Sequence, residues 1–171
     1  MPAMPKPKIS TRLLTLAAAA ALVALDQWIK LWMSALLAPG ARVLVRGLLG
    51  LRYTENTGIS FSLFGESGLA MRVISVATAL VMLAGAVWLL LGKIGGVLPL
   101  CGAALILAGG TGNLFDRMAQ GFVVDYIELL FTRFAIFNFA DICITCGVAL
   151  VTFWVVRSEY TEHKRKDKAL P

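Results

Sequence analysis

Four long stretches of mainly apolar residues dominate the hydropathy pattern of this chain. They cover about residues 13–38, 73–91, 94–115 and 134–156. A bilayer core about 30 Å thick needs about 20 apolar residues in α-helix, so each stretch is long enough to cross it. The pattern therefore predicts an all-α membrane protein with four transmembrane helices in one domain, residues 1–156, followed by a basic tail over 157–171.

The segment between the first two stretches, residues 39–72, has a different period. Val43 and Val45 alternate with other residues, and Ile59, Phe61 and Leu63 alternate with serines. Alternation with period two predicts short strands with one apolar face. Because open sheet edges cannot lie inside the lipid, we expect a small extracytoplasmic β segment at the membrane surface, over about residues 40–66.

The composition supports the membrane assignment. The chain has 171 residues, of which 58% are hydrophobic and 15% are charged, and its mean hydropathy is +0.80. Soluble domains are roughly half apolar and about a quarter charged. The first stretch begins like a secretory signal, but the segment from Asp26 to Met33 resumes a helical, aromatic-rich pattern where a cleavage region would stand. We therefore expect an uncleaved first span.

Positive charges lie mainly at the two ends of the chain. Lysine and arginine number 16 against 10 acidic residues, a net charge of +6. The basic residues are not interleaved with aromatic stacking groups, so no nucleic-acid partner is expected. Basic residues flanking apolar spans are typical of cytoplasmic segments. With nine Lys and Arg on the side of the termini and six on the other, both termini are predicted to be cytoplasmic, with Gly92 and Lys93 in a cytoplasmic turn.

Cysteine and histidine offer little chemistry. Cys101, Cys143 and Cys146 all lie in apolar stretches, which argues against a disulfide framework. Cys143 and Cys146 have the spacing of half a metal site, but a tetrahedral site needs further ligands. His163, the only histidine, lies in the charged tail, so a hydrolase with a catalytic histidine is disfavoured. We expect no metal and no cofactor.

Charged residues inside the spans are candidates for function, because burying them in lipid is costly. Asp26 and Lys30 are four residues apart on one helix and can pair with each other, so a structural role is at least as plausible as a catalytic one. Asp141 has no basic residue in its own span. It is expected about 10 Å inside the fourth span, with Asn138 one turn earlier.

A second acid stands out in the segment before the fourth span. Asp125 lies in an apolar run, Phe122 to Ile127, where an ordinary loop would be polar. If this segment folds back over the fourth span, Asp125 and Asp141 can meet. A pair of carboxylates can hydrolyse a peptide bond without metal or histidine, one acting as base toward water and the other as acid toward the carbonyl oxygen. Asp116 and Arg117 are interpreted as a surface ion pair, or Arg117 as a group that orients a carboxylate or binds a lipid phosphate.

Five short motifs occur in order along the chain, and each is weak alone. They are Asp26-Gln27-x-x-Lys30, Asn56-Thr57-Gly58, Gly110-x-x-Asn113-Leu114-Phe115-Asp116-Arg117, Val124-Asp125-Tyr126-Ile127 and Phe137-Asn138-x-Ala140-Asp141. Together, over about residues 20–150, they strongly resemble bacterial lipoprotein signal peptidase (signal peptidase II), a four-span aspartic peptidase of the inner membrane.

The resemblance implies that Asp125 and Asp141 are the catalytic pair. It implies a site near the outer leaflet, a surface β-cradle from residues 40–66, a gating segment from 117–133, and inhibition by globomycin. The implied substrates are diacylglyceryl-modified prolipoproteins, cut on the amino side of the lipidated cysteine. The expected partners are these substrates and membrane lipids, and we expect the protein to be a monomer. Supporting or substrate-binding roles fall to Asp26, Lys30, Asn56, Gly110, Asn113, Arg117, Asn138 and Ala140.

Two other functions fit parts of the pattern. A small proton- or ion-coupled transporter subunit would use Asp26, Asp125 and Asp141 as relay groups, but such proteins place acids near the midplane and often contain inverted repeats. Here Asp125 and Asp141 fall toward one face, and no repeat is visible. An assembly protein whose polar residues only hold helices together would give no reason for the acid in the 122–127 run.

Overall fold

The computed structural model describes residues 6–57 and 68–167. The predicted strand pattern at Ile59, Phe61 and Leu63 lies outside the described residues. Four helices are long and apolar enough to cross a membrane, which confirms the expected four-span architecture. They are α1 (Ile9–Leu37), α2 (Gly68–Leu90), α3 (Val97–Gln120) and α4 (Phe139–Asp167).

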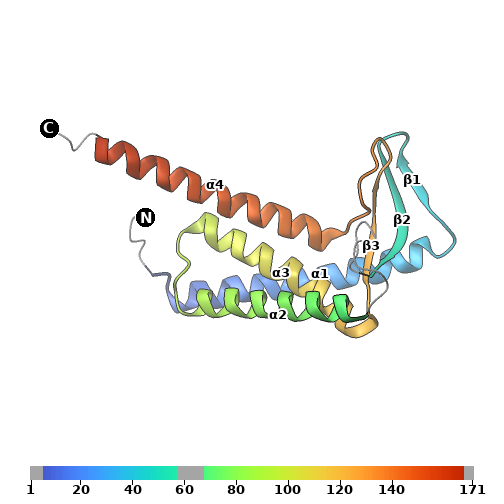
Figure 1. The fold of residues 1–171 in the computed structure, drawn as a ribbon, viewed down its shortest axis with the longest axis horizontal. Helices are drawn as coiled ribbons and strands as arrows, with labels where there is room; N and C mark the ends of the chain where they lie inside the picture. The colour runs from blue at the N-terminus through green and yellow to red at the C-terminus, as the bar shows by residue number, and fades with distance from the viewer. Residues whose placement is uncertain (1–5, 58–67, 168–171) are drawn as a thin grey trace.

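The helices run beside one another along the longest dimension of the molecule (Figure 1). Helix α3 is the central one and packs against α1, α2 and α4. The start of α1, the end of α4 and the α2–α3 turn lie at one end of the bundle, which we call the turn end (Figure 1). A small sheet lies at the other end, the sheet end. An even number of crossings brings the first and last helical residues to the same end.

The sheet contains β1 (Arg42–Val45), β2 (Leu49–Asn56) and β3 (Val123–Leu129), all antiparallel, in the order β1-β2-β3. Gly47, with φ of +73°, makes the turn between β1 and β2. The expected β segment lay wholly between the first two spans, whereas β3 comes from the connection between α3 and α4. Strand β3 was not predicted from the sequence. Its first four residues are all buried, so the strand shows no alternation of apolar and polar positions.

Several helix boundaries differ from the predicted spans, and those of α3 and α4 bear on the site. Helix α3 continues to Gln120, five residues beyond the predicted end at residue 115, so the last part of the third span is helical but carries charges. Helix α4 begins at Phe139, so residues 134–138 are a connection, and it continues to Asp167 through much of the expected tail. Lysine, arginine and glutamate are good helix formers, which explains why the helix does not end with the apolar stretch.

Small residues let α3 and α4 approach closely. A Cβ on Gly102 would lie 2.9 Å from the carbonyl oxygen of Gly147, and a Cβ on Gly147 would lie 2.7 Å from that of Gly102. Closer to the sheet, Gly109 packs on the backbone of Ala140. Small residues at helix crossings are the usual way for membrane helices to gain contact area.

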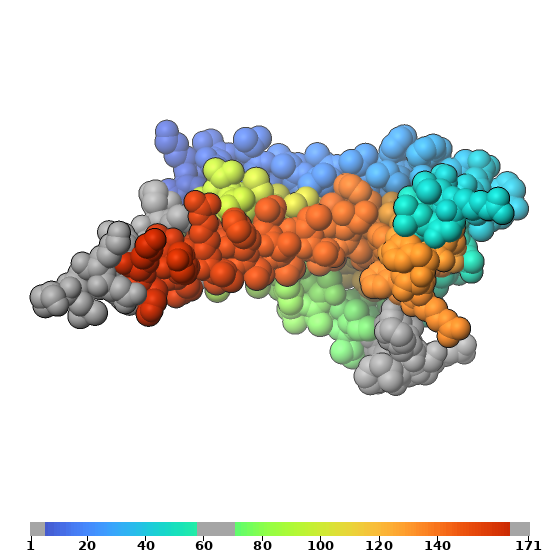
Figure 2. All heavy atoms as spheres, turned by 90° about the horizontal axis from the view of Figure 1, so that it is seen from above, coloured from blue at the N-terminus to red at the C-terminus, as the bar shows by residue number. Residues whose placement is uncertain are grey.

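The outer surface of the bundle is apolar and its interior is partly polar. Large side chains such as Leu31, Val97 and Phe153 are more than half exposed along the spans. Figure 2 shows α4 lying along one face of the molecule over its whole length. By contrast, Asp26, Lys30 and several other polar side chains are almost fully buried. This arrangement is typical of a protein whose solvent is lipid.

Candidate active site

Asp141 is fixed by the start of α4. Asn138 precedes the first helical residue, and its Oδ1 accepts a hydrogen bond from the Asp141 amide at 3.0 Å. In return, the Asp141 Oδ2 accepts the Asn138 amide at 3.1 Å. This reciprocal pattern is a capping box, which satisfies two backbone donors that a helix N-terminus leaves free. Asp141 therefore lies in the first turn of α4, not about 10 Å inside the span as predicted, and it is half-buried.

Asp125 lies on β3, opposite Thr54 of β2, and its side chain is buried. Asn56, two residues further along β2, donates its Nδ2 to the Asp125 Oδ2 at 2.8 Å. A cavity of about 200 Å³ adjoins this pair and is lined also by Thr57 and Ile136. The pairing of β2 with β3 thus places a buried carboxyl group beside a small cavity at the sheet end.

Two asparagines bring the two acids into one hydrogen-bonded group. Asn138 Nδ2 donates to Asp125 Oδ1 at 2.7 Å, while the same residue caps Asp141. Asn113, on α3, donates its Nδ2 to Asp141 Oδ1 at 2.8 Å, and its Oδ1 accepts Asn138 Nδ2 at 3.1 Å. The structure therefore brings together Asn56, Asp125, Asn138, Asn113 and Asp141 from four separate segments.

A buried cluster of three charged residues, Asp26, Lys30 and Asp116, contacts Asn113. Lys30 Nζ donates to Asn113 Oδ1 at 2.9 Å, which fixes which end of that amide faces Asp141. The same ammonium pairs with Asp26 at 2.9 Å, as predicted from their spacing, and with Asp116 at 2.8 Å. Asp26, Lys30 and Asp116 are at most 3% exposed. Asp116 is thus not in a surface ion pair with Arg117, because its partner is the buried Lys30.

Asp116 also connects this cluster to the strand that carries Asp125. Its Oδ2 accepts the backbone N–H of Val124, the residue before Asp125, at 3.2 Å. Gln27 Nε2 donates to Asp116 Oδ1 at 2.9 Å. Neither Gln27 nor Asp116 was among the predicted site residues, although both stand inside the motifs. Asp116 lies three residues after Asn113 on α3, and this spacing places both on one helix face.

The pKa of Asp125 is raised to about 6, from an ordinary value of 3.8. Burial is the main cause and the nearby charge of Asp141 adds to it, while the amide donors of Asn56 and Asn138 oppose the shift. Burial likewise raises the pKa of Tyr126 to about 12. The Tyr126 hydroxyl accepts the backbone N–H of Phe139 at 3.2 Å, so it ties β3 to the first turn of α4. The site therefore holds one acid that keeps its proton to a higher pH than an ordinary aspartate does.

The remaining predicted site residues occupy different places. Arg117 is half-buried one turn beyond Asn113, donates its Nη1 to the Asn113 carbonyl oxygen at 3.4 Å, and has a buried Nε without a hydrogen-bond partner among the described residues. Ala140, on α4, is fully buried against the glycines of α3. Gly110 faces α2, where an added Cβ would meet Met82, so the structure places it in helix packing rather than at the carboxylates.

This arrangement defines a class of protein. Two carboxyl groups share a network of asparagine donors at one end of a four-helix membrane bundle, and one of them has a raised pKa. Such a pair can hold one proton between them, so that one group acts as base while the other donates a hydrogen bond. Among the described residues, no cluster of three His, Cys, Asp or Glu side chains could hold a metal ion. A four-helix membrane bundle that carries such a pair of acids fits a membrane-embedded aspartic hydrolase.

Comparison with known proteins makes the class specific. The family model described as signal peptidase (SPase) II matches residues 18–157. A lipoprotein signal peptidase of Lactiplantibacillus plantarum is 39% identical over 143 residues, covering 83% of this chain and 93% of that protein. One from Mesorhizobium japonicum is 41% identical over 139 residues, covering 78% and 79%. The chain therefore belongs to the signal peptidase II family.

Solved structures agree at the level of the fold. One described as a bacterial membrane enzyme aligns with a TM-score of 0.74 at 24% identity, covering 92% of this chain and 94% of that one. A second with the same description gives a TM-score of 0.75. The bundle and its sheet are thus shared with known bacterial membrane enzymes.

Proposed function

We propose that this protein removes the signal peptide from diacylglyceryl-modified prolipoproteins, cutting on the amino side of the lipidated cysteine, with Asp125 and Asp141 as the catalytic pair. The observation that carries the assignment of residues is the bridging by Asn138, which donates to Asp125 at 2.7 Å and caps Asp141. Family membership supports the reaction, and the relatives carry the name lipoprotein signal peptidase.

The chemistry requires one ionised and one protonated carboxyl group. The ionised group takes a proton from water as the water oxygen attacks the scissile carbonyl carbon. The protonated group donates a hydrogen bond to the carbonyl oxygen, which carries the charge of the tetrahedral intermediate. Collapse of the intermediate breaks the C–N bond, and the proton taken from water goes to the leaving nitrogen. The products are the signal peptide with a new carboxylate and the lipoprotein with a free amine on its cysteine.

The asparagines supply orientation rather than protons. Asn56 and Asn138 donate to the two oxygens of Asp125, and Asn113 donates to Asp141, so each carboxyl plane is fixed before substrate arrives. Preorganised donors of this kind lower the cost of charge changes during the reaction. Arg117 is half-buried and lies one turn from Asn113, so its guanidinium would bind a carbonyl oxygen of a substrate at the site.

We further propose that both termini are cytoplasmic and that the site faces the outer leaflet. The turn end carries Lys8, Arg12 and Lys93, and α4 ends there in a basic run, as expected for cytoplasmic segments. A site near the outer leaflet allows the acyl chains of the substrate to stay in the lipid and position the peptide. Each buried methylene contributes about 0.8 kcal/mol, so the diacylglyceryl group is expected to be a major determinant of affinity.

The test is cleavage of a defined substrate by the purified protein in detergent. A diacylated prolipoprotein should yield two products, identified by mass spectrometry as the signal peptide and a lipoprotein beginning with the modified cysteine. The matched control is the same precursor without the diacylglyceryl group, which should be cut at least tenfold more slowly. A cut at another bond, or equal rates for the two precursors at matched concentrations, would overturn the proposed substrate.

A further inference from the structure

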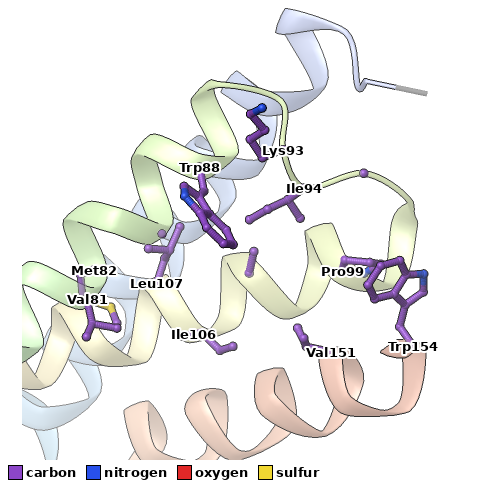
Figure 3. Close-up of a pocket in the computed structure, with 13 residues that line it drawn as sticks. Val81, Met82, Trp88, Lys93, Ile94, Pro99, Ile106, Leu107, Val151 and Trp154 are labelled. Carbon is purple, nitrogen blue, oxygen red and sulfur yellow. The ribbon is translucent and has the colours of Figure 1, made fainter. Parts of the chain in front are cut away.

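A second cavity lies far from the carboxylates, near the turn end of the bundle. Its volume is about 420 Å³, and it is bounded by α2, α3, α4 and the α2–α3 turn (Figure 3). Helices α2 and α4 both pack on α3 but have no substantial contact with each other, so α3 forms the floor of a groove between them. We call this the α2–α4 groove. Volumes of about 300–1,000 Å³ are typical of sites that hold small ligands.

The walls of the α2–α4 groove are apolar apart from one residue at its rim. Met82 and Leu107 lie toward the middle of the bundle, and Trp88 and Trp154 contribute rings from α2 and α4 near the turn end (Figure 3). Tryptophan is enriched where a membrane span meets the headgroup layer. The groove therefore extends from the depth of the headgroups into the hydrocarbon region.

The rim of the groove carries positive charge. Lys93, in the α2–α3 turn, is the one charged lining residue, and its side chain is exposed and has no ion-pair partner among the described residues. Arg157, three residues after Trp154 on α4, is also exposed at this end. Arg12 is committed to structure, because its Nη1 donates to the Leu90 carbonyl oxygen at 2.8 Å. An apolar groove with an uncompensated cation at its mouth fits a molecule with an apolar tail and an anionic head.

We propose that the α2–α4 groove binds one anionic phospholipid, with an acyl chain between α2 and α4 and the headgroup phosphate at Lys93. Basic pockets between membrane helices are a recognised form of lipid site. The bound chain supplies the contacts that α2 and α4 do not make with each other. This site is independent of the peptidase reaction assigned to the sheet end.

The alternative occupant is the helix of a substrate signal peptide. Such peptides have a positively charged region before their apolar core. A helix lying in the groove with that region at the turn end would bring its charges next to Lys93, which repels them. Charge complementarity thus favours the anionic lipid.

The test uses delipidated, full-length protein in detergent and native mass spectrometry. Dioleoyl-phosphatidylglycerol, which is anionic, should give one saturable adduct at least fivefold tighter than dioleoyl-phosphatidylcholine, which has the same chains and no net charge. To locate the site, Trp28 and Trp32 of α1 are replaced by Phe, which leaves Trp88 and Trp154 as the chain's remaining tryptophans. Phosphatidylglycerol with brominated chains should then quench the fluorescence with the same saturation curve.

Two variants and two controls distinguish specific lipid binding in the groove from non-specific lipid binding to the apolar surface. Lys93→Gln should weaken phosphatidylglycerol binding about fivefold without affecting the fold, since one Lys near anionic lipid contributes about that factor. Ala103→Phe, which fills the groove, should remove the saturable adduct. Lys8→Gln, just before α1, and Ala21→Phe, on α1, make the same changes at exposed positions outside the groove and should stay within twofold of the parent protein.

Equal binding of the two lipids, or unchanged binding in either Lys93→Gln or a folded Ala103→Phe, would overturn the proposal. A synthetic signal peptide that displaces the brominated lipid at lower concentration than phosphatidylglycerol itself would also overturn it, because the groove would then be a peptide site. Lys93→Gln is an exposed substitution, so this arm remains decisive even if Ala103→Phe does not fold.

Discussion

The two ends of this bundle are held together by opposite means. At the sheet end, α1, α3 and α4 meet through charges and amides, with Lys30 between Asp26 and Asp116 and with Asn113 linking α3 to α4. At the turn end, the same helices meet through small and apolar residues, with glycine against glycine between α3 and α4. Polar contacts in lipid fix geometry, whereas small residues only permit close approach.

The two ends also differ in what burial costs in free energy of folding. Burying three charged groups and several amides carries a desolvation penalty, which apolar packing does not carry. At the sheet end these buried polar groups hold Asp125 and Asp141 in one hydrogen-bonded group. At the turn end nothing comparable is buried, and a groove remains between α2 and α4. Substitutions at the sheet end should therefore impair cleavage, whereas substitutions at the turn end should affect stability alone.

The largest effect is expected from Lys30→Met. It leaves the carboxylates of Asp26 and Asp116 buried without their cation, and breaking a buried ion pair from one side costs about 3–5 kcal/mol. We expect a large drop in melting temperature in detergent, low yield and loss of cleavage. Lys8→Met, an exposed lysine at the turn end, is the control and should leave all three unchanged. A stable Lys30→Met protein would show that the ion cluster does not hold the sheet end together.

Asn138→Ala should have the next largest effect, because one side chain caps α4 and bridges both acids. Loss of a helix cap and of a buried hydrogen bond together costs about 2–3 kcal/mol. Cleavage should fall at least a hundredfold. Asn138→Ser is the matched control, since serine is a good cap but cannot reach Asp125 from this position. It should recover most of the melting temperature but not the rate, and recovery of both would contradict the bridging role.

At the turn end, Gly147→Ala should lower stability without changing the chemistry. The added Cβ would lie 2.7 Å from the Gly102 carbonyl oxygen, so α3 and α4 must separate, at a cost of about 1–2 kcal/mol. Gly85→Ala on α2 is the control, because its Cβ would meet only Leu107 at an ordinary 3.4 Å. We expect a lower melting temperature for Gly147→Ala alone, with cleavage per folded molecule preserved. A lost rate at normal stability would mean that the two ends are coupled.

A smaller effect should appear in the pH dependence of stability. The pKa of Asp125 is raised to about 6 in the folded protein from 3.8, so the folded state holds this proton more tightly than the unfolded chain does. This contribution to stability is fully present below about pH 4 and is lost as the pH rises through about 6. In detergent, Asp125→Asn should therefore gain melting temperature relative to the parent between pH 4 and 6.5, and no further above. A constant difference over this range would contradict the raised pKa.

Much of this fold could be predicted from the sequence, because hydropathy over 20-residue windows responds to lipid directly. The pairing of Asp26 with Lys30 also followed from helical spacing. The predicted depth of Asp141 was wrong, because hydropathy does not show that residues 134–138 are a connection and that Asn138 caps the helix. Strand β3 was hidden because burial on both faces removes alternation. The part played by Asp116 depends on the long-range contact of α3 with α1, which no local pattern reveals.

The central claim is that Asp125 and Asp141 act as one catalytic unit, and paired measurement of cleavage rate and melting temperature tests it most directly. Asp125→Asn, Asp141→Asn and the double variant are compared in one detergent with Glu128→Gln, an acid on the same strand whose partner is Arg52 at the surface. Each single variant should lose at least about a thousandfold in rate with the melting temperature retained or raised, and the double variant should be no slower than either. Glu128→Gln should cleave normally. Near-normal cleavage by either aspartate variant, or losses that multiply in the double variant, would contradict the account.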